Sequence, residues 1–125
     1  MTENEISEQI IGAAIEVHRE LGPGLLESAY EECLAHEMNL RGLVFERQKP
    51  LPVIYKGIRV ECGFRLDFIV HDLVVVELKA VEELANIHQA QVMTYLKLTG
   101  CKLGLLINFN DVRIKYGLKR IVLNL

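Results

Sequence analysis

The sequence lacks the features that mark membrane, secreted and zinc-binding proteins. No stretch approaches the roughly 18 uninterrupted apolar residues of a membrane-spanning helix, and residues 1–5 are acidic where a signal peptide is basic. The three cysteines, Cys33, Cys62 and Cys101, are odd in number and form no C-x-x-C pair, which argues against a disulfide framework or a zinc site. We therefore expect a cytoplasmic protein without membrane contact, in which each cysteine is a small buried side chain.

Basic residues are scarce in the first 40 positions, which carry one, Arg19, against nine acidic residues. Residues 41–125 carry thirteen basic residues against eight acidic ones, so the formal net charge of the whole chain is −3. This global balance argues against tight, non-specific binding of nucleic acid. The mildly basic remainder can nevertheless meet a polyanion.

Low-complexity segments, repeats and linkers are also absent. Half of the 125 residues are hydrophobic and a quarter are charged, which is typical of a globular domain and not of a disordered or fibrous chain. A chain of this length can bury roughly two thirds of the surface that it exposes when unfolded. We expect a single domain over residues 1–125.

Apolar residues recur at helical spacing in two N-terminal segments, residues 6–21 and 26–38. Thr2 and Glu5 precede the first segment with the spacing of a capping box, and a Gly-Pro-Gly sequence ends it. Gly42 follows the second segment in the position of a helix C-terminus. The pattern predicts two helices joined by a short loop.

After Gly42, β-branched and aromatic residues appear in short runs, which is typical of strands. The runs are residues 44–45, 53–55, 58–60, 64–70 and 73–78. Pro50 and Pro52 favour an edge strand or a bulge between them, and Lys56-Gly57 is a candidate hairpin turn.

A third helix and two further strands complete the pattern. Asn86 and Gln89 have the spacing of an N-cap and its capping partner, and Gly100 closes this helix. The apolar run 103–107 is typical of a strand buried on both faces, so we place it inside the sheet beside the strand that precedes the helix. Residues 121–123 add a last strand. The order predicts an α/β sandwich with a mixed sheet.

Two carboxylates interrupt strands that otherwise look like core. Asp67 lies in an apolar strand and Glu77 directly follows three valines, and buried carboxylates are costly unless positive charge compensates them. Glu77 and Lys79 are two apart and share a strand face. If residues 71–73 form the connection, Asp67 pairs with Glu77 and both acids point the same way. A two-residue connection would place Val76 opposite Asp67 instead.

Such a pair beside a lysine makes an oxygen-rich pocket suited to Mg²⁺ or Mn²⁺, in which the ammonium can hold an attacking water or a phosphate oxygen. Taken alone, the E-x-K spacing carries little weight, because ordinary composition produces it by chance and its alternative is surface charge on an edge strand. Gln91 and Tyr95, four apart on one helix face, and Glu27, an acid near a helix start, add weight.

The ordered combination of these motifs resembles the GxxExxY proteins of the PD-(D/E)XK nuclease superfamily over residues 10–123. The motifs are G-x-x-E-x-x-Y (Gly24, Glu27, Tyr30), G-x-R-x-D (Gly63, Arg65, Asp67), E-x-K (Glu77, Lys79) and Q-x-x-x-Y (Gln91, Tyr95). The combination is specific although each motif is weak. Leu66 stands where the superfamily's nominal motif has proline.

The resemblance implies a restriction-endonuclease-like αβββαβ core, a mixed sheet flanked by helices, and a site that binds Mg²⁺ or Mn²⁺. By position, the metal ligands would be Asp67, Glu77, the Leu78 carbonyl and Glu27. Lys79 would orient or activate the water. Substrate contacts would come from Gln91, Tyr95, Arg65 and Tyr30.

Each of these residues also has a structural interpretation. Glu27 can be an acid favoured by the helix dipole, and Tyr30 and Tyr95 can be core aromatics. Gln91 can face solvent, and Arg65 can be a cross-strand ion-pair partner.

Two functions therefore stay open at this point. The first is a metal-dependent nuclease, a phosphodiesterase acting on DNA rather than RNA, in repair or recombination. The second is a non-catalytic binding or assembly module that keeps the nuclease fold. The expected partner is nucleic acid, and a homodimer is one assembly that we consider.

Overall fold

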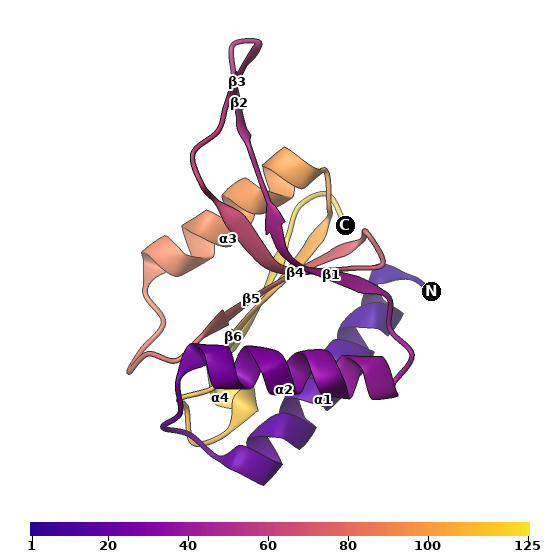
Figure 1. Cartoon of the computed structure of the whole chain (residues 1–125), viewed down its shortest axis with the longest axis vertical. Helices are drawn as coiled ribbons and strands as arrows, with labels where there is room; N and C mark the ends of the chain where they lie inside the picture. Colours follow the sequence, from indigo (N-terminus) through magenta and orange to yellow (C-terminus); the bar gives the residue numbers. More distant parts are fainter.

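The computed structural model describes all residues from 1 to 125. It contains a five-stranded sheet, and Figure 1 shows helices on both faces of this sheet. The elements are α1 (Glu3–Leu21), α2 (Glu27–Leu40), β1 (Phe45–Pro50), β2 (Val53–Tyr55), β3 (Ile58–Val60), β4 (Arg65–Val70), β5 (Val74–Lys79), α3 (Asn86–Thr99), β6 (Leu103–Asn108), α4 (Ile114–Gly117) and β7 (Leu118–Val122). The predicted α/β fold with a mixed sheet flanked by helices is confirmed. No helix has both the length and the apolar character that a membrane crossing requires.

The N-terminal helix pair forms as the sequence predicts. Thr2 caps α1 through a capping box with Glu5, since the Glu5 N–H donates to the Thr2 hydroxyl and the Glu5 carboxylate accepts from the Thr2 N–H. For α3 the predicted cap is wrong. Ala85 occupies the N-cap position, and its N–H donates to Nδ1 of His88 at 3.0 Å, so neither Asn86 nor Gln89 has the expected role.

The main sheet has the strand order β1-β4-β5-β6-β7. Its only parallel pair is β5 with β6, which places Lys79 beside Asn108 at the carboxyl ends of both strands. The pairing of β4 with β5 begins at Val70 and Val74, so residues 71–73 form the three-residue connection. This is the register in which Asp67 stands opposite Glu77.

Two cores fill the space on either side of the sheet. The helical-pair core lies between the sheet and α1 and α2, and it contains Val74, Val76 and Leu78. The α3 core lies on the other face and contains Val75. Side chains alternate along a strand, so Glu77 and Lys79 point to the same face as Val75, which is the face that α3 covers.

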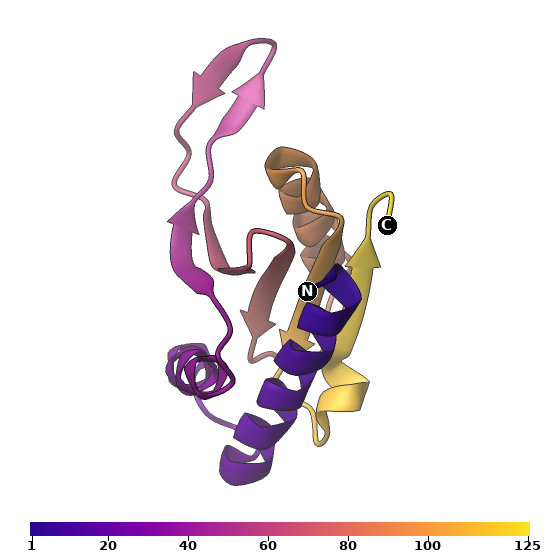
Figure 2. The ribbon, with the colours of Figure 1, turned by 90° about the vertical axis from the view of Figure 1, so that its right-hand side faces the viewer.

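The β2–β3 ribbon stands clear of the body in both views (Figures 1 and 2). Lys56 and Gly57 form its tip with φ values of 47° and 81°, which confirms the predicted hairpin turn. Pro50 ends β1, which is an edge strand of the sheet. The segment between Pro50 and Pro52, where an edge strand or a bulge was predicted, is in no strand. The expectation that every cysteine is buried is confirmed only for Cys101. Cys33 is half-buried, and Cys62 is exposed where the ribbon joins β4.

The C-terminal segment contains one turn of helix, α4, that the sequence analysis did not predict. Four residues are too few to show helical periodicity. The last strand begins at Leu118, three residues earlier than predicted, because Lys119 and Arg120 face solvent at the sheet edge and carry no apolar signal.

Candidate active site

Asp67 and Glu77 exchange hydrogen bonds with each other's strands. The backbone N–H of Asp67 donates to Oε1 of Glu77 at 3.1 Å, and the backbone N–H of Leu78 donates to Oδ2 of Asp67 at 2.8 Å. The backbone pairing of β4 with β5 stops one residue earlier, at Phe68 and Val76. The two carboxylates therefore hold the strands together at the point where the ladder ends.

Strand β4 and its neighbour β1 are both irregular at the level of Asp67. Leu66 packs in the α3 core and Phe68 in the helical-pair core, although residues two apart in a regular strand share a face. Gln48, the β1 residue opposite Asp67, has φ of 50°, which is unfavourable for a residue other than glycine. Strained backbone of this kind persists where the surroundings hold it in place, often at functional sites.

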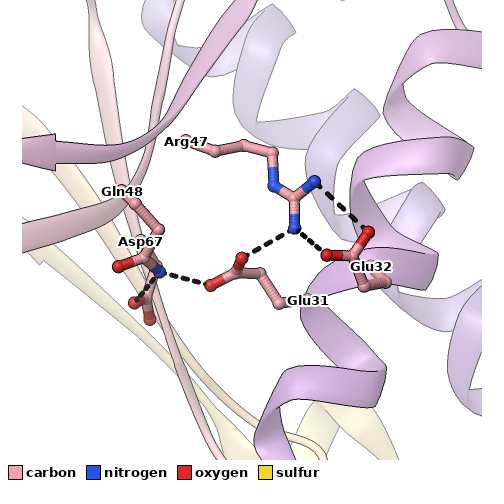
Figure 3. Close-up of polar contacts among 5 residues, drawn as sticks. All are labelled: Glu31, Glu32, Arg47, Gln48 and Asp67. Atoms are coloured by element: carbon pink, nitrogen blue, oxygen red, sulfur yellow. Dashed lines mark hydrogen bonds and ion pairs between the residues drawn. The ribbon is translucent and has the colours of Figure 1, made fainter.

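The Gln48 side chain connects the sheet to α2. Its amide donates to Oδ1 of Asp67 over a long 3.4 Å and to Oε1 of Glu31. The Arg47 guanidinium meets Glu31 at 2.8 Å and Glu32 at 2.6 Å, and Figure 3 shows this chain of contacts from α2 to Asp67. These contacts link α2, which begins at Glu27, to β1 and to Asp67.

Glu27 is the third acid of the group. Its carboxylate makes no hydrogen bond or ion pair in the structure. Although the residue is exposed overall, its pKa is raised, first by loss of solvent around the carboxylate and then by the negative charge of Asp67, while the Lys79 ammonium opposes the shift. Glu27 and Asp67 are thus close enough to repel each other.

Tyr30 holds the turn that presents Glu27. Its ring is fully buried and stacks on Phe109 with centroids 4.7 Å apart. Its hydroxyl donates to the Gly22 carbonyl at 2.6 Å and accepts from the Leu25 N–H at 3.1 Å. Tyr30 therefore does not reach the surface where a substrate would lie.

Glu77 carries the strongest electrostatic perturbation of the group. Only 4% of the residue is exposed, and burial, followed by the charge of Asp67, raises its pKa to about 9. The Lys79 ammonium opposes this shift and makes no ion pair with any carboxylate. Glu77 is therefore costly to ionise in this site, and Lys79 is the cation available to offset that cost.

The remaining predicted residues lie around this group. Tyr95 is 4% exposed and packs in the α3 core against Phe64, with ring centroids 6.4 Å apart. Its pKa is raised to about 12 by burial and then by the charges of Glu77 and Asp67, so its hydroxyl is close to the acids. Gln91 is half-buried on the same helix, and Arg65 is exposed and makes no ion pair.

The donor chemistry at this strand end suits a hard divalent cation, because every candidate ligand is an oxygen. Oε2 of Glu77 accepts no hydrogen bond, and no buried side-chain oxygen in the protein lacks a partner, so solvent reaches this atom. The acids do not line an open cavity, however, and no three carboxylate, imidazole or thiol groups converge on one point. Asp67 and Glu77 lie together at the strand end, and Glu27 faces them from α2 without completing a cluster of three ligands.

Sequence reasoning missed the residues that hold the chain in position directly after Lys79. Asn108 is fully buried, and its amide clamps Val81 by accepting from its N–H at 3.0 Å and donating to its carbonyl at 2.9 Å. The Phe109 N–H donates to the Lys79 carbonyl at 2.9 Å. The sequence signal for the role of Asn108 was a polar amide directly after the apolar run 103–107. Gln48 and Glu31 gave none, because their roles depend on which strand pairs with β4.

A known family model matches most of the chain. The sequence model of the PD-(D/E)XK nuclease superfamily matches residues 4–121, which is nearly the whole chain. No curated protein and no solved structure matches the chain.

Proposed function

We propose that this chain, which belongs to the PD-(D/E)XK nuclease superfamily, is a metal-dependent phosphodiesterase that hydrolyses DNA. The superfamily indicates a nuclease-type function, a nucleic-acid substrate and the use of divalent metal ions. One observation carries the proposal. Asp67 and Glu77 pair across two strands beside an unpaired Lys79, so acidic oxygens and a cation meet at one strand end.

The ligands that we propose for Mg²⁺ or Mn²⁺ are Asp67, Glu77, the Leu78 carbonyl and Glu27. The pKa values of Glu77 and Glu27 are raised first by burial and then by the negative charge of Asp67. A cation would favour the ionised form of both carboxylates, which supports this set. When bound, such an ion supplies Lewis-acid polarisation of a phosphate oxygen and activation of water.

The other residues act on the substrate or on the site. We propose that the Lys79 ammonium orients the attacking water and stabilises the charge that develops on the phosphate. Arg65, Gln91 and Tyr95 would contact the nucleic-acid strand. Tyr30 was expected to contact substrate, but its hydroxyl is used twice within the chain, so we assign it the task of positioning Glu27.

Several finer assignments rest on narrower support. Membership of the GxxExxY group, the choice of DNA over RNA and a role in repair or recombination rest on the motif resemblance. Location in the cytoplasm rests on three free cysteines. Action as a single domain and assembly as a homodimer stay predictions.

A cleavage assay tests the proposal. Labelled single-stranded, duplex and branched DNA, with RNA of the same sequence as a comparison, are incubated with Mg²⁺, Mn²⁺ or EDTA. We expect cleavage of DNA that requires the ion and is lost in Glu77→Gln. The matched control is Glu83→Gln, which makes the same chemical change at an exposed loop residue and should retain activity. Ion-independent cleavage, or equal loss in both variants, would reject the proposal.

A binding or assembly module is the second candidate. It is favoured by one observation, the absence of three converging metal ligands. On this account DNA binds and is never cut with either ion, and Glu77→Gln leaves the affinity unchanged.

A further inference from the structure

A basic cavity of about 460 Å³ lies between the end of α1 and α4, outside the acidic site. Its lining residues are Ile15, His18, Arg19, Arg113, Ile114 and Lys115. No acidic side chain lines it, although α1 is otherwise strongly acidic. Arg19, the only lysine or arginine among the first 40 residues, is one of the lining residues.

Two of the cavity's cations have no carboxylate partner. Arg113 and Lys115 appear in no ion pair, whereas Arg19 pairs with Glu16 on its own helix. The Lys115 ammonium lies 5.1 Å from the Tyr116 ring centroid, a contact that leaves its charge uncompensated. With two unpaired cations and no acidic residue in its lining, the cavity has a positive potential that favours an anion.

The cavity is joined to the acidic site through the segment that follows β6. The Phe109 N–H holds the Lys79 carbonyl at 2.9 Å, and the Asn108 side chain bonds Asp111 at 3.0 Å. On the cavity side, Nε2 of His18 meets the Asp111 carbonyl oxygen at 2.8 Å. Figures 1 and 2 show α4 below the ends of β5 and β6, against the last turns of α1. One short hydrogen-bonded segment thus separates Lys79 from the basic cavity.

We propose that this cavity binds a backbone phosphate of the nucleic-acid strand, next to the phosphate that is cleaved. The proposal rests on the proposed function and adds a substrate contact to it. Successive phosphates of a strand lie about 3.4 Å apart along a duplex axis, so a strand held at Lys79 carries further phosphates past the neighbouring edge of the protein. The Arg113 guanidinium suits a phosphate because its parallel N–H groups match two oxygens.

The alternative is that these cations serve the fold alone. The carboxyl end of α1 carries partial negative charge, which nearby cations stabilise. In that case, removing them lowers the free energy of unfolding and leaves nucleic-acid binding unchanged.

The test compares two double variants with the same loss of charge. Arg113→Gln with Lys115→Gln changes the cavity. Lys97→Gln with Lys102→Gln changes two exposed lysines, one near the end of α3 and one just before β6, away from the cavity. Binding of labelled duplex DNA is measured by fluorescence anisotropy over a salt series, in EDTA and in Ca²⁺, and unfolding by denaturant is measured for each protein.

We expect the cavity variant to bind at least about tenfold more weakly. We expect its salt slope to fall by about one, because one phosphate contact is lost. The lysine control should keep both values. Equal changes in the two double variants, or a loss of stability without a loss of binding, would overturn the inference. If the wild-type protein binds and cleaves DNA and the cavity variant binds equally well, only this inference is rejected. Wild-type protein that binds no DNA removes the proposed function as well.

Discussion

Asp67 and Glu77 stand opposite each other across β4 and β5, and each carboxylate accepts a hydrogen bond from the backbone of the other's strand. This geometry fixes both side chains without using all of their oxygens. Little solvent reaches this pair, so Glu77 holds its proton near neutral pH, and ionising it beside Asp67 puts the fold under electrostatic stress when no cation is bound. The predictions below follow from that stress and from the contacts around it.

Stability should fall as pH rises through the neutral range in metal-free buffer. The folded protein keeps a proton on Glu77 up to a pKa of about 9, whereas the unfolded chain releases it near the ordinary value of 4.5. Between these values the folded state binds more protons, so the free energy of unfolding decreases with pH. Denaturant unfolding in EDTA should show that Glu77→Gln is the more stable protein at pH 8 and has a flatter pH profile. A profile parallel to that of wild type would contradict this, and Glu83→Gln supplies the control.

Divalent ions should raise the melting temperature. An ion that binds only the folded state at a hundred times its Kd adds about 2.7 kcal/mol, which corresponds to a shift of several degrees in a domain of this size. We expect millimolar Mg²⁺ or Mn²⁺ to produce such a shift, EDTA to reverse it, and Glu77→Ala to abolish it. An unchanged melting temperature in wild type, or a shift that survives in Glu77→Ala, would show that the ion binds elsewhere.

Glycine should be better tolerated than alanine at position 48. Gln48 has φ of 50°, a conformation that costs an L-residue about 1 kcal/mol and costs glycine little. Both substitutions remove the amide that reaches Asp67 and Glu31, so their difference isolates the backbone. Denaturant unfolding should show Gln48→Gly to be about 1 kcal/mol more stable than Gln48→Ala. The same pair of changes at Lys49, whose φ is not positive, should give the opposite order.

Tyr30→Phe should destabilise the fold without directly weakening DNA binding. The variant leaves the Gly22 carbonyl and the Leu25 N–H without their partner, at a cost of about 1–2 kcal/mol. The control is Tyr116→Phe at a tyrosine with 60% exposure, which should have no effect on unfolding. A Tyr30→Phe protein with normal stability and weaker DNA binding would instead make Tyr30 a substrate contact.

The acid pair could be predicted from the sequence because it depends on local parity. A three-residue connection between β4 and β5 fixes which residues face each other, and alternation along each strand fixes the shared face. The helix pair and the hairpin turn were likewise determined by short-range signals, namely the Thr2 capping box and Lys56-Gly57.

The parts that could not be predicted depend on distant contacts. Gln48 has a positive φ, and its amide donates to Asp67 and Glu31, which come from two other elements. Asn86 has the better intrinsic preference for an N-cap, yet Ala85 occupies that position and the His88 ring accepts its N–H. The motif predicts a substrate contact for Tyr30, and only the packing shows that its hydroxyl binds the turn at Gly22 and Leu25.

The measurement that tests the account most directly is single-turnover cleavage of labelled DNA in Mn²⁺ by wild type, Lys79→Ala and Tyr95→Phe. The Lys79 ammonium would act on charge that develops in the transition state, so its removal should lower the rate on the order of 100-fold, as for other preorganised donors. Tyr95→Phe should mainly weaken substrate affinity, because that hydroxyl would contact the strand equally in the bound substrate and in the transition state. Equal loss in both variants would contradict this division of roles. Undiminished cleavage by Lys79→Ala would contradict the active site itself and favour a binding module.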